Sequence, residues 1–137
     1  MKINVIGLGY IGLPTALIMA ANGLEVVGTD YNKDLVNTLN SGKVTFEEKG
    51  LQELFDEALN KNIKFTTEYE NTDMYIVAVP TPYDKFSKKV DAIYVCKAVE
   101  CVMSSCKKGA IVVIESTVSP GTIDKYVRPI IEKNGFK

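Results

Sequence analysis

The glycine-rich turn near the N-terminus constrains the fold more than any other feature. The chain opens MKINVIGLGYIGLPTALIMAANGLEVVGTD, in which a strand pattern runs into Gly7-Leu8-Gly9-Tyr10-Ile11-Gly12 and a helical pattern follows. In a G-x-G-x-x-G motif of this kind, the first glycine permits a tight turn and the second lets the backbone approach a pyrophosphate. The third glycine lets the helix pack closely on the strand, and the amides at the helix start attract an anion. We therefore expect Gly7, Gly9 and Gly12 to form a phosphate-binding turn.

An acidic residue stands where such a nucleotide site needs one. Asp30 ends the second expected strand, 18 residues after Gly12. A carboxylate at this position accepts hydrogen bonds from the adenosine ribose and repels a 2′-phosphate. The sequence therefore predicts NAD rather than NADP as the cofactor, although Lys33 stands close enough to soften the charge near Asp30. An alternative without a nucleotide site is that the glycines only turn the chain and that Asp30 only caps a helix.

The same apolar opening has some parts of a secretory signal peptide. Lys2 precedes the apolar run and Ala20-Ala21 follows it. However, Asn4 and Pro14, together with the glycines, interrupt the run, and a second strand pattern follows without a cleavage loop. No stretch holds eighteen clean apolar residues, so we expect no membrane span and a cytoplasmic location.

Strand and helix patterns alternate from one end of the chain to the other. This alternation predicts a Rossmann-like α/β fold, a doubly wound parallel sheet with helices on both faces, as one domain over residues 1–137. Ligands of such sheets bind at the carboxyl ends of the strands, which here are followed by loops 7–12, 30–33, 80–83 and 116–121. The expected strands are 2–6, 24–28, 63–66, 74–79 and 111–114, the last two buried on both faces, and the expected helices are 10–22, 32–39, 50–60, 91–107 and one from 122.

Local signals place the ends and faces of these helices. Asn32, Asp91 and Thr122 are expected to cap the helices that follow them, and residues 43–49 and 83–90 are expected to be loops. The apolar side of helix 50–60 is expected to carry four residues: Leu51, Leu54, Phe55 and Leu59.

Two further loops carry less specific signals. Val79-Pro80-Thr81-Pro82 follows the 74–79 strand, and its rigid turn could hold a second ribose through the Thr81 hydroxyl. Ser116 and Thr117 follow the 111–114 strand and bring hydroxyls to where a nicotinamide ring would lie. Each loop also fits a plain strand-ending turn, and the residues alone leave both interpretations open.

Composition removes several other functions. The chain has no histidine, which is the most common general base and metal ligand, and we expect no metal site. The formal net charge of −1 gives no reason to expect nucleic acid or a membrane surface as a partner. Cys96, Cys101 and Cys106 are five residues apart, which is about 140° per step on a helix, so their thiols do not share a face. We expect three reduced thiols that pack as small apolar groups.

Five segments together resemble the NAD-binding domain of the UDP-glucose/GDP-mannose dehydrogenase family. They are VIGLGYIGLPTA, GTDYNKDLVNTLNSGKVTFEEKGLQEL, TDMYIVAVPTP, VDAIYVCKAVE and GAIVVIESTVSPGT. The VPTP and ESTVSPGT segments, in this order after the glycine motif, are far more specific than the motif alone. The form GLGYIGLPTA is most similar to the branch that oxidises UDP-N-acetylmannosamine or UDP-N-acetylglucosamine.

This resemblance implies a reaction and a set of residue roles. The family oxidises the C6 alcohol of a nucleotide sugar to a carboxylate with two NAD, and a cysteine traps the intermediate aldehyde. By resemblance, the Ile11 backbone contacts the pyrophosphate with Tyr10 beside it, and Asp30 holds the ribose. Thr81 and Thr117 approach the nicotinamide half, and Thr117 helps to order a catalytic water. The cofactor-binding set expected here is Gly7, Gly9, Tyr10, Ile11, Gly12, Asp30, Lys33, Val79, Pro80, Thr81, Ser116 and Thr117.

The chain also departs from the family pattern. Many members carry a basic residue where this chain has Leu35, and Lys33 either replaces that residue or the contact is missing. Members are much longer, so this chain resembles an excised or truncated domain without the central helix, the UDP-sugar domain and the nucleophilic cysteine. We expect it to bind NAD without turning over substrate alone, within a parent that is a homodimer. The alternatives are a domain of a 6-phosphogluconate or 3-hydroxyacid dehydrogenase, and a non-catalytic NAD-binding module.

Overall fold

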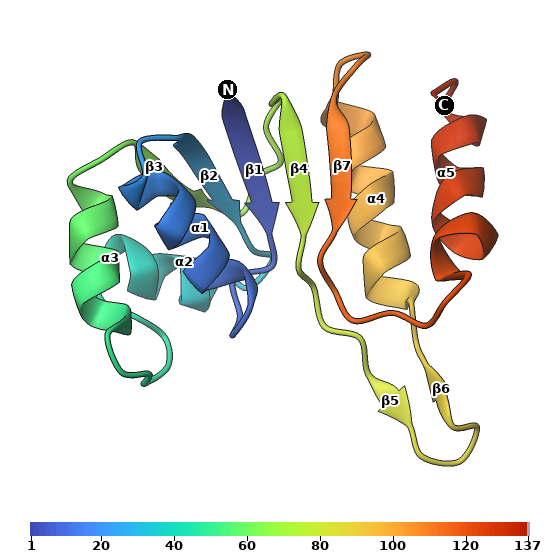
Figure 1. Ribbon diagram of the computed structural model, residues 1–137, viewed down its shortest axis with the longest axis horizontal. Helices are drawn as coiled ribbons and strands as arrows, with labels where there is room; N and C mark the ends of the chain where they lie inside the picture. Colours follow the sequence, from blue (N-terminus) through green and yellow to red (C-terminus); the bar gives the residue numbers. More distant parts are fainter. Residues whose placement is uncertain (137) are drawn as a thin grey trace.

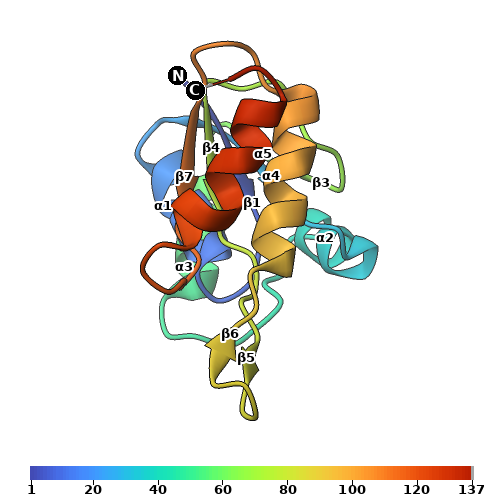
Figure 2. The same cartoon turned by 90° about the vertical axis from the view of Figure 1, so that its right-hand side faces the viewer.

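A five-stranded parallel sheet forms the centre of the protein. The computed structural model describes residues 1–136 and orders the strands β3-β2-β1-β4-β7, with every neighbouring pair parallel (Figure 1). Helices cover both faces, so the expected doubly wound fold is confirmed (Figure 2). The strands are β1 (Lys2–Ile6), β2 (Glu25–Thr29), β3 (Ile63–Thr66), β4 (Met74–Val77) and β7 (Ile111–Ile114).

The order of the strands places a crevice at one edge of the sheet. β1 is central, with β2 and β3 on one side and β4 and β7 on the other. The direction of winding therefore reverses between β1 and β4, and ligands of open α/β sheets bind outside the carboxyl ends of the strands at such a point. Ile6, the last residue of β1, is in register with Thr29 of β2 and Val77 of β4, so the three strands end together.

Two apolar cores hold the helices to the sheet. One lies between β1–β3 and the helices α1, α2 and α3, and includes Leu17, Leu39 and Phe55. The other lies between β4 and α4 and includes Tyr75 and Val99. The helical segments are α1 (Gly12–Ala21), α2 (Lys33–Asn40), α3 (Leu51–Leu59), α4 (Ile93–Ser105), the π-helical turn η1 (Ile123–Val127) and α5 (Arg128–Lys133).

The helix caps follow the sequence signals only in part. The Asn32 side chain accepts hydrogen bonds from the amides of Asp34 and Leu35, as expected of an N-cap. The expectation for Thr122 is wrong, because its side chain makes no capping hydrogen bond and the segment begins as a π-helical turn. The expected apolar side of helix 50–60 is also wrong at Leu59, which is 43% exposed, because Ala58 takes the buried position.

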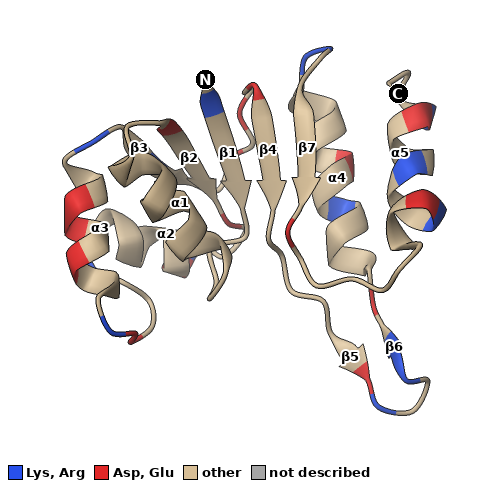
Figure 3. Ribbon diagram, viewed as in Figure 1, with Lys and Arg blue, Asp and Glu red and all other residues tan. Residues whose placement is uncertain are grey.

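Residues 83–90 form a hairpin where the sequence predicted a loop. β5 (Tyr83–Asp84) pairs antiparallel with β6 (Lys89–Val90), and the hairpin projects beyond the carboxyl edge of the sheet (Figure 1). Three lysines, Lys85, Lys88 and Lys89, lie in or beside its turn (Figure 3). Because the strands are only two residues long, they show no alternation of apolar and polar residues that would predict them.

The expectation that strand 111–114 is buried on both faces is wrong. β7 is the last strand in the sheet order, and Ile111 and Val113 are 54% and 39% exposed. These two residues are in register with Met74 and Ile76 on the face where α1 packs. In Figure 1, α1 and α3 lie over the other half of this face, so none of the described helices covers β7 there.

None of the described helices is long and apolar enough to cross a membrane.

Candidate cofactor site

The glycine turn joins β1 to α1 and depends on glycine at two positions. Gly7 has a φ of 89°, and a Cβ there would lie 2.7 Å from the Ala78 carbonyl oxygen. A Cβ on Gly12 would lie 1.7 Å from the Gly7 carbonyl oxygen, so the close packing of helix and strand requires glycine. At Gly9 a Cβ would meet no atom within 4 Å, so this part of the turn is open to an incoming ligand. Gly7 and Gly12 therefore have the turn and packing roles that the motif predicts, and the open space at Gly9 fits the third role.

The Asp30 carboxylate lies directly beside this turn. Its Oδ2 accepts a hydrogen bond from the Leu8 amide at 2.8 Å, and its Oδ1 accepts one from the Asn32 amide at 2.9 Å. Asp30 is only 9% exposed, so the two amides compensate for much of the water that the charged group loses. The carboxylate is therefore fixed at the end of β2, and its remaining lone pairs are available to ribose hydroxyls.

A cleft at the carboxyl ends of β1, β2, β4 and β7 brings most of the expected residues together. Two expected residues do not line this cleft: Gly12, which packs against the Gly7 carbonyl, and Lys33, the exposed first residue of α2. Tyr31, Asn32, Leu35, Ala78 and Glu115 line the cleft in addition to the expected residues. The lining residues are Gly7, Gly9, Tyr10, Ile11, Asp30, Tyr31, Asn32, Leu35, Ala78, Val79, Pro80, Thr81, Glu115, Ser116 and Thr117.

Hydrogen bonds hold the β7 end of the cleft to its neighbours. The Ser116 hydroxyl donates to the Val79 carbonyl at 2.7 Å and so joins two of the expected cofactor-binding loops. The Thr15 hydroxyl of α1 donates to Glu115 Oε1 at 3.0 Å. Thr117 follows these fixed positions and is exposed at the cleft. The loops after β4 and β7 therefore form one wall that faces the glycine turn.

A second hollow adjoins the cleft on the side of α4, and sequence reasoning missed it. Tyr94, Lys97 and Cys101 of α4 line it together with Tyr69 and Tyr31, and Gly7, Asp30 and Pro80 line both spaces. Its lining is largely aromatic and apolar and suits a flat heterocycle next to the ribose site. Tyr94, Lys97, Ala98 and Cys101 are spaced i, i+3, i+4 and i+7, so the helical period was the available signal.

Tyr69 is fixed in this hollow by its surroundings. The Asn4 side chain donates to the Thr29 hydroxyl at 2.8 Å, and that hydroxyl donates to the Glu68 carbonyl at 2.9 Å. This chain of bonds ties the segment before Tyr69 to β1 and β2. Burial raises the pKa of the Tyr69 hydroxyl, and the adjacent Cys101 thiol raises it further. Tyr69 therefore presents a neutral hydroxyl at any physiological pH.

The three cysteines differ in their surroundings, and all are free thiols. Cys96 and Cys106 are partly buried, and burial raises the pKa of each thiol, as expected of small packing residues. Cys101 is exposed and borders the hollow, which the sequence did not predict. Among residues 1–136, no cluster of three or more Cys, Asp or Glu side chains could hold a metal ion.

The residues of the cleft fit a dinucleotide. Two glycines are sterically required, the third leaves open space at the start of α1, and a fixed carboxylate stands at the end of the next strand. A pyrophosphate fits the open amides at the helix start, and the ribose fits the carboxylate. The adjoining apolar hollow has the character that a heterocyclic base requires.

Comparison with known proteins also indicates a dinucleotide-binding domain, and the similarity extends along the full chain. Residues 1–137 match the model of the "UDP-glucose/GDP-mannose dehydrogenase family, NAD binding domain". The chain is 45% identical over 136 residues to the UDP-N-acetyl-D-mannosamine dehydrogenase of Methanococcus maripaludis, covering 96% of this chain and 32% of that protein.

Two solved structures illustrate the likeness in three dimensions. The UDP-N-acetyl-mannosamine dehydrogenase Cap5O from Staphylococcus aureus superposes with a TM-score of 0.95 at 40% identity, covering 100% of this chain and 34% of that one. A GDP-mannose dehydrogenase from Pseudomonas aeruginosa gives 0.87 at 29% identity, covering 98% and 32%. The chain thus spans about a third of the length of the relatives that it matches.

Proposed function

The chain belongs to the UDP-glucose/GDP-mannose dehydrogenase family as an NAD-binding domain, and from that premise we propose that it serves a nucleotide-sugar 6-dehydrogenase. The enzyme oxidises the C6 alcohol of a UDP-sugar, namely UDP-N-acetylmannosamine, to a carboxylate and consumes two NAD per sugar. The observation that carries this proposal is the match to the family along all 137 residues. The substrate is taken from the names of relatives in Methanococcus maripaludis (45% identical) and Campylobacter jejuni (38% identical), which are UDP-N-acetyl-D-mannosamine dehydrogenases.

Each side of the cleft has a role in this proposal. The amides of the Gly9–Ile11 turn hold the pyrophosphate, and the Asp30 carboxylate holds the adenosine ribose. Thr81 binds the second ribose, and Ser116 and Thr117 border the nicotinamide, with Thr117 also ordering a water. NAD, when bound, supplies the hydride acceptor.

The isolated chain binds NAD but does not oxidise sugar in this proposal. Its three cysteines do not match the position of the family's nucleophile, because Cys96 and Cys101 lie on α4 and Cys106 follows it directly. Burial also raises the pKa of the Cys96 and Cys106 thiols. The sugar-binding part and the nucleophile belong to further sequence of a cytoplasmic, homodimeric parent. The family match favours this proposal over a 6-phosphogluconate or 3-hydroxyacid dehydrogenase.

The test is to read the source gene beyond Lys137, express the whole reading frame and follow NADH formation with several UDP-sugars. We expect UDP-N-acetylmannosamine to give two NADH per sugar, with UDP-N-acetylglucosamine and UDP-glucose slower, and the 137-residue chain to give none. A reading frame that ends at Lys137, or one whose product oxidises no UDP-sugar, would instead support a non-catalytic NAD-binding module.

A further inference from the structure

The loop between α2 and α3 touches the glycine turn through one aromatic contact. The ring centroids of Tyr10, in the turn, and Phe46, in the loop, lie 4.5 Å apart at an interplanar angle of 42°. Tyr10 is 73% exposed, whereas Phe46 is half-buried and packs against the core under α1 and α3. Phe46 therefore gives an otherwise exposed side chain of the turn a fixed partner.

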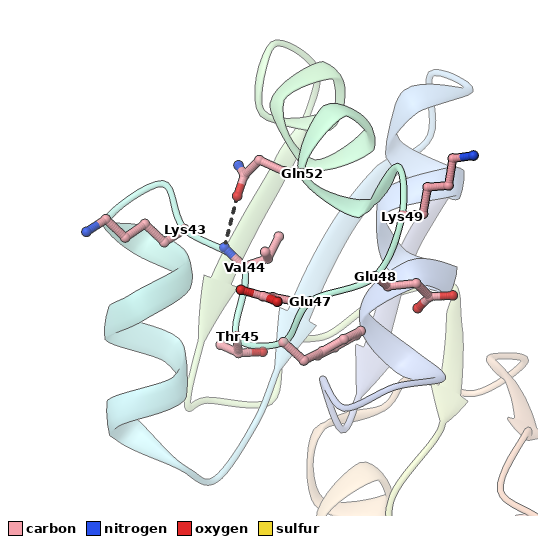
Figure 4. A pocket seen from close by; sticks show the side chains of 8 residues that line it. Lys43, Val44, Thr45, Glu47, Glu48, Lys49 and Gln52 are labelled. Carbon is pink, nitrogen blue, oxygen red and sulfur yellow. Dashed lines mark hydrogen bonds between the residues drawn. The ribbon is translucent and has the colours of Figure 1, made fainter.

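The loop has few other attachments to the protein. Gly42 and Gly50, at its two ends, have φ angles of 89° and 81°, which are conformations that favour glycine. The Gln52 side chain accepts a hydrogen bond from the Val44 amide at 3.5 Å (Figure 4). It also donates one to the Gly42 carbonyl, again at 3.5 Å. The charged side chains of Lys43 and Lys49 extend away from the loop in Figure 4. Apolar packing by Val44 and Phe46 is therefore the main anchor of the loop to the core.

On the other side of the contact lies the backbone that would meet a phosphate. The Leu8 amide is bonded to Asp30, and the Leu13 amide is bonded to the Gly9 carbonyl at 3.1 Å. The backbone between these fixed points runs from Gly9 to Gly12, and it borders open space at Gly9, where a Cβ would meet no atom within 4 Å. A glycine-rich backbone loses conformational freedom when it binds a ligand, so a contact that orders it beforehand raises affinity.

We propose that Phe46 is a positioning residue for the pyrophosphate, because it holds the Tyr10 ring and so fixes the Gly9–Ile11 amides. The inference rests on the proposed NAD site and adds a residue from outside the cleft. It predicts that the loop between α2 and α3 affects ligands that carry phosphates and leaves adenosine binding unchanged.

The experiment compares adenosine, ADP and NAD by calorimetric titration against Phe46→Ala and Phe46→Leu. Phe46→Leu keeps apolar packing against the core, so it reports on the aromatic contact even where Phe46→Ala loosens the fold. We expect both variants to bind ADP and NAD about five- to tenfold more weakly and adenosine equally well. Phe46→Tyr keeps the ring and restores ADP and NAD binding. Phe86→Ala removes a 99% exposed aromatic side chain from the hairpin and is the matched control.

A double-mutant cycle tests whether Phe46 affects ADP binding through the Tyr10 ring. Once Tyr10→Ala has removed the partner ring, Phe46→Leu should cause no further loss of ADP affinity. Equal losses for adenosine and ADP, unchanged ADP binding in Phe46→Leu, or additive losses in the cycle would each overturn the inference. In those cases NAD binding by the wild-type chain would still support the proposed cofactor site. A wild-type chain that binds no NAD would contradict both the cofactor site and the role of Phe46.

Discussion

Gly9 and Gly12 occupy the same turn, but a side chain would meet different surroundings at each. At Gly12 a Cβ collides with the Gly7 carbonyl, which is backbone and cannot rotate away. At Gly9 the same Cβ meets nothing in the chain and fills the space proposed for the pyrophosphate. The two residues therefore separate a structural requirement from a ligand-binding one.

The prediction is that Gly12→Ala loses stability and Gly9→Ala loses affinity. Gly12→Ala should lower the free energy of unfolding by about 2–3 kcal/mol, as overpacking does, while Gly9→Ala should lower it by less than about 1 kcal/mol. Gly9→Ala should weaken NAD binding by about tenfold or more. Urea denaturation and NAD titration of both variants check this. A Gly9→Ala protein that binds NAD normally would show that the phosphate does not approach this backbone.

The Glu70 carboxylate, in the loop before β4, connects two strands of the sheet. Glu70 forms ion pairs with Lys64 of β3 and, at 3.0 Å, with Lys2 of β1. Hydrogen bonds from Lys64 and then from Lys2 hold the pKa of Glu70 below its ordinary value of 4.5. The ionised form is therefore more stable in the folded protein than in the unfolded chain.

The stability contributed by Glu70 should depend on pH in a fixed direction. Because the folded pKa is the lower one, the contribution is complete above pH 4.5 and is lost as the pH falls through the folded value. Glu70→Gln should lower the free energy of unfolding by less than about 1 kcal/mol at pH 7, and the difference should vanish in acid. Urea denaturation between pH 3 and 7, with Glu57→Gln on α3 as control, measures this. A difference that stays constant over the range would contradict it.

The sequence predicted the elements with a clear period and missed those that depend on neighbours. The five parallel strands and the Asn32 cap follow from local patterns and were found. Exposure of β7 depends on which helices reach its face, which the apolar residues of 111–114 do not encode. The β5–β6 hairpin is too short to show alternation, and the π-helical start of residues 123–127 has no signal in the sequence.

The site was predictable to the extent that its residues follow strand ends. Asp30, Thr81 and Thr117 lie at the carboxyl edge because parallel strands bring their ends together, and the structure places all three on one cleft. Tyr69 comes from a loop without a motif, so only three-dimensional proximity reveals it, whereas the helical spacing of Cys101 shows which face of α4 it shares but not that this face borders the site.

The uncovered face of β7 predicts that copies of this chain associate with one another. Ile111 and Val113 are exposed on a strand at the edge of the sheet, where unpaired backbone also invites contact. We expect weak, concentration-dependent self-association in sedimentation experiments, which Ile111→Lys should reduce. Phe86→Ser, which also removes an exposed apolar side chain, should leave it unchanged. A clean monomer at high concentration would contradict this prediction.

Calorimetric titration of the 137-residue chain with NAD and NADP tests the proposed NAD site most directly. Asp30→Ala and, as control, Asp34→Ala at the exposed first turn of α2 are titrated in parallel. We expect NAD to bind and NADP to bind clearly more weakly. Asp30→Ala should lose about 1–3 kcal/mol of NAD binding, while Asp34→Ala should not. If neither nucleotide binds, or if NADP binds as well as NAD, the cleft between the glycine turn and Asp30 is not the NAD site described above.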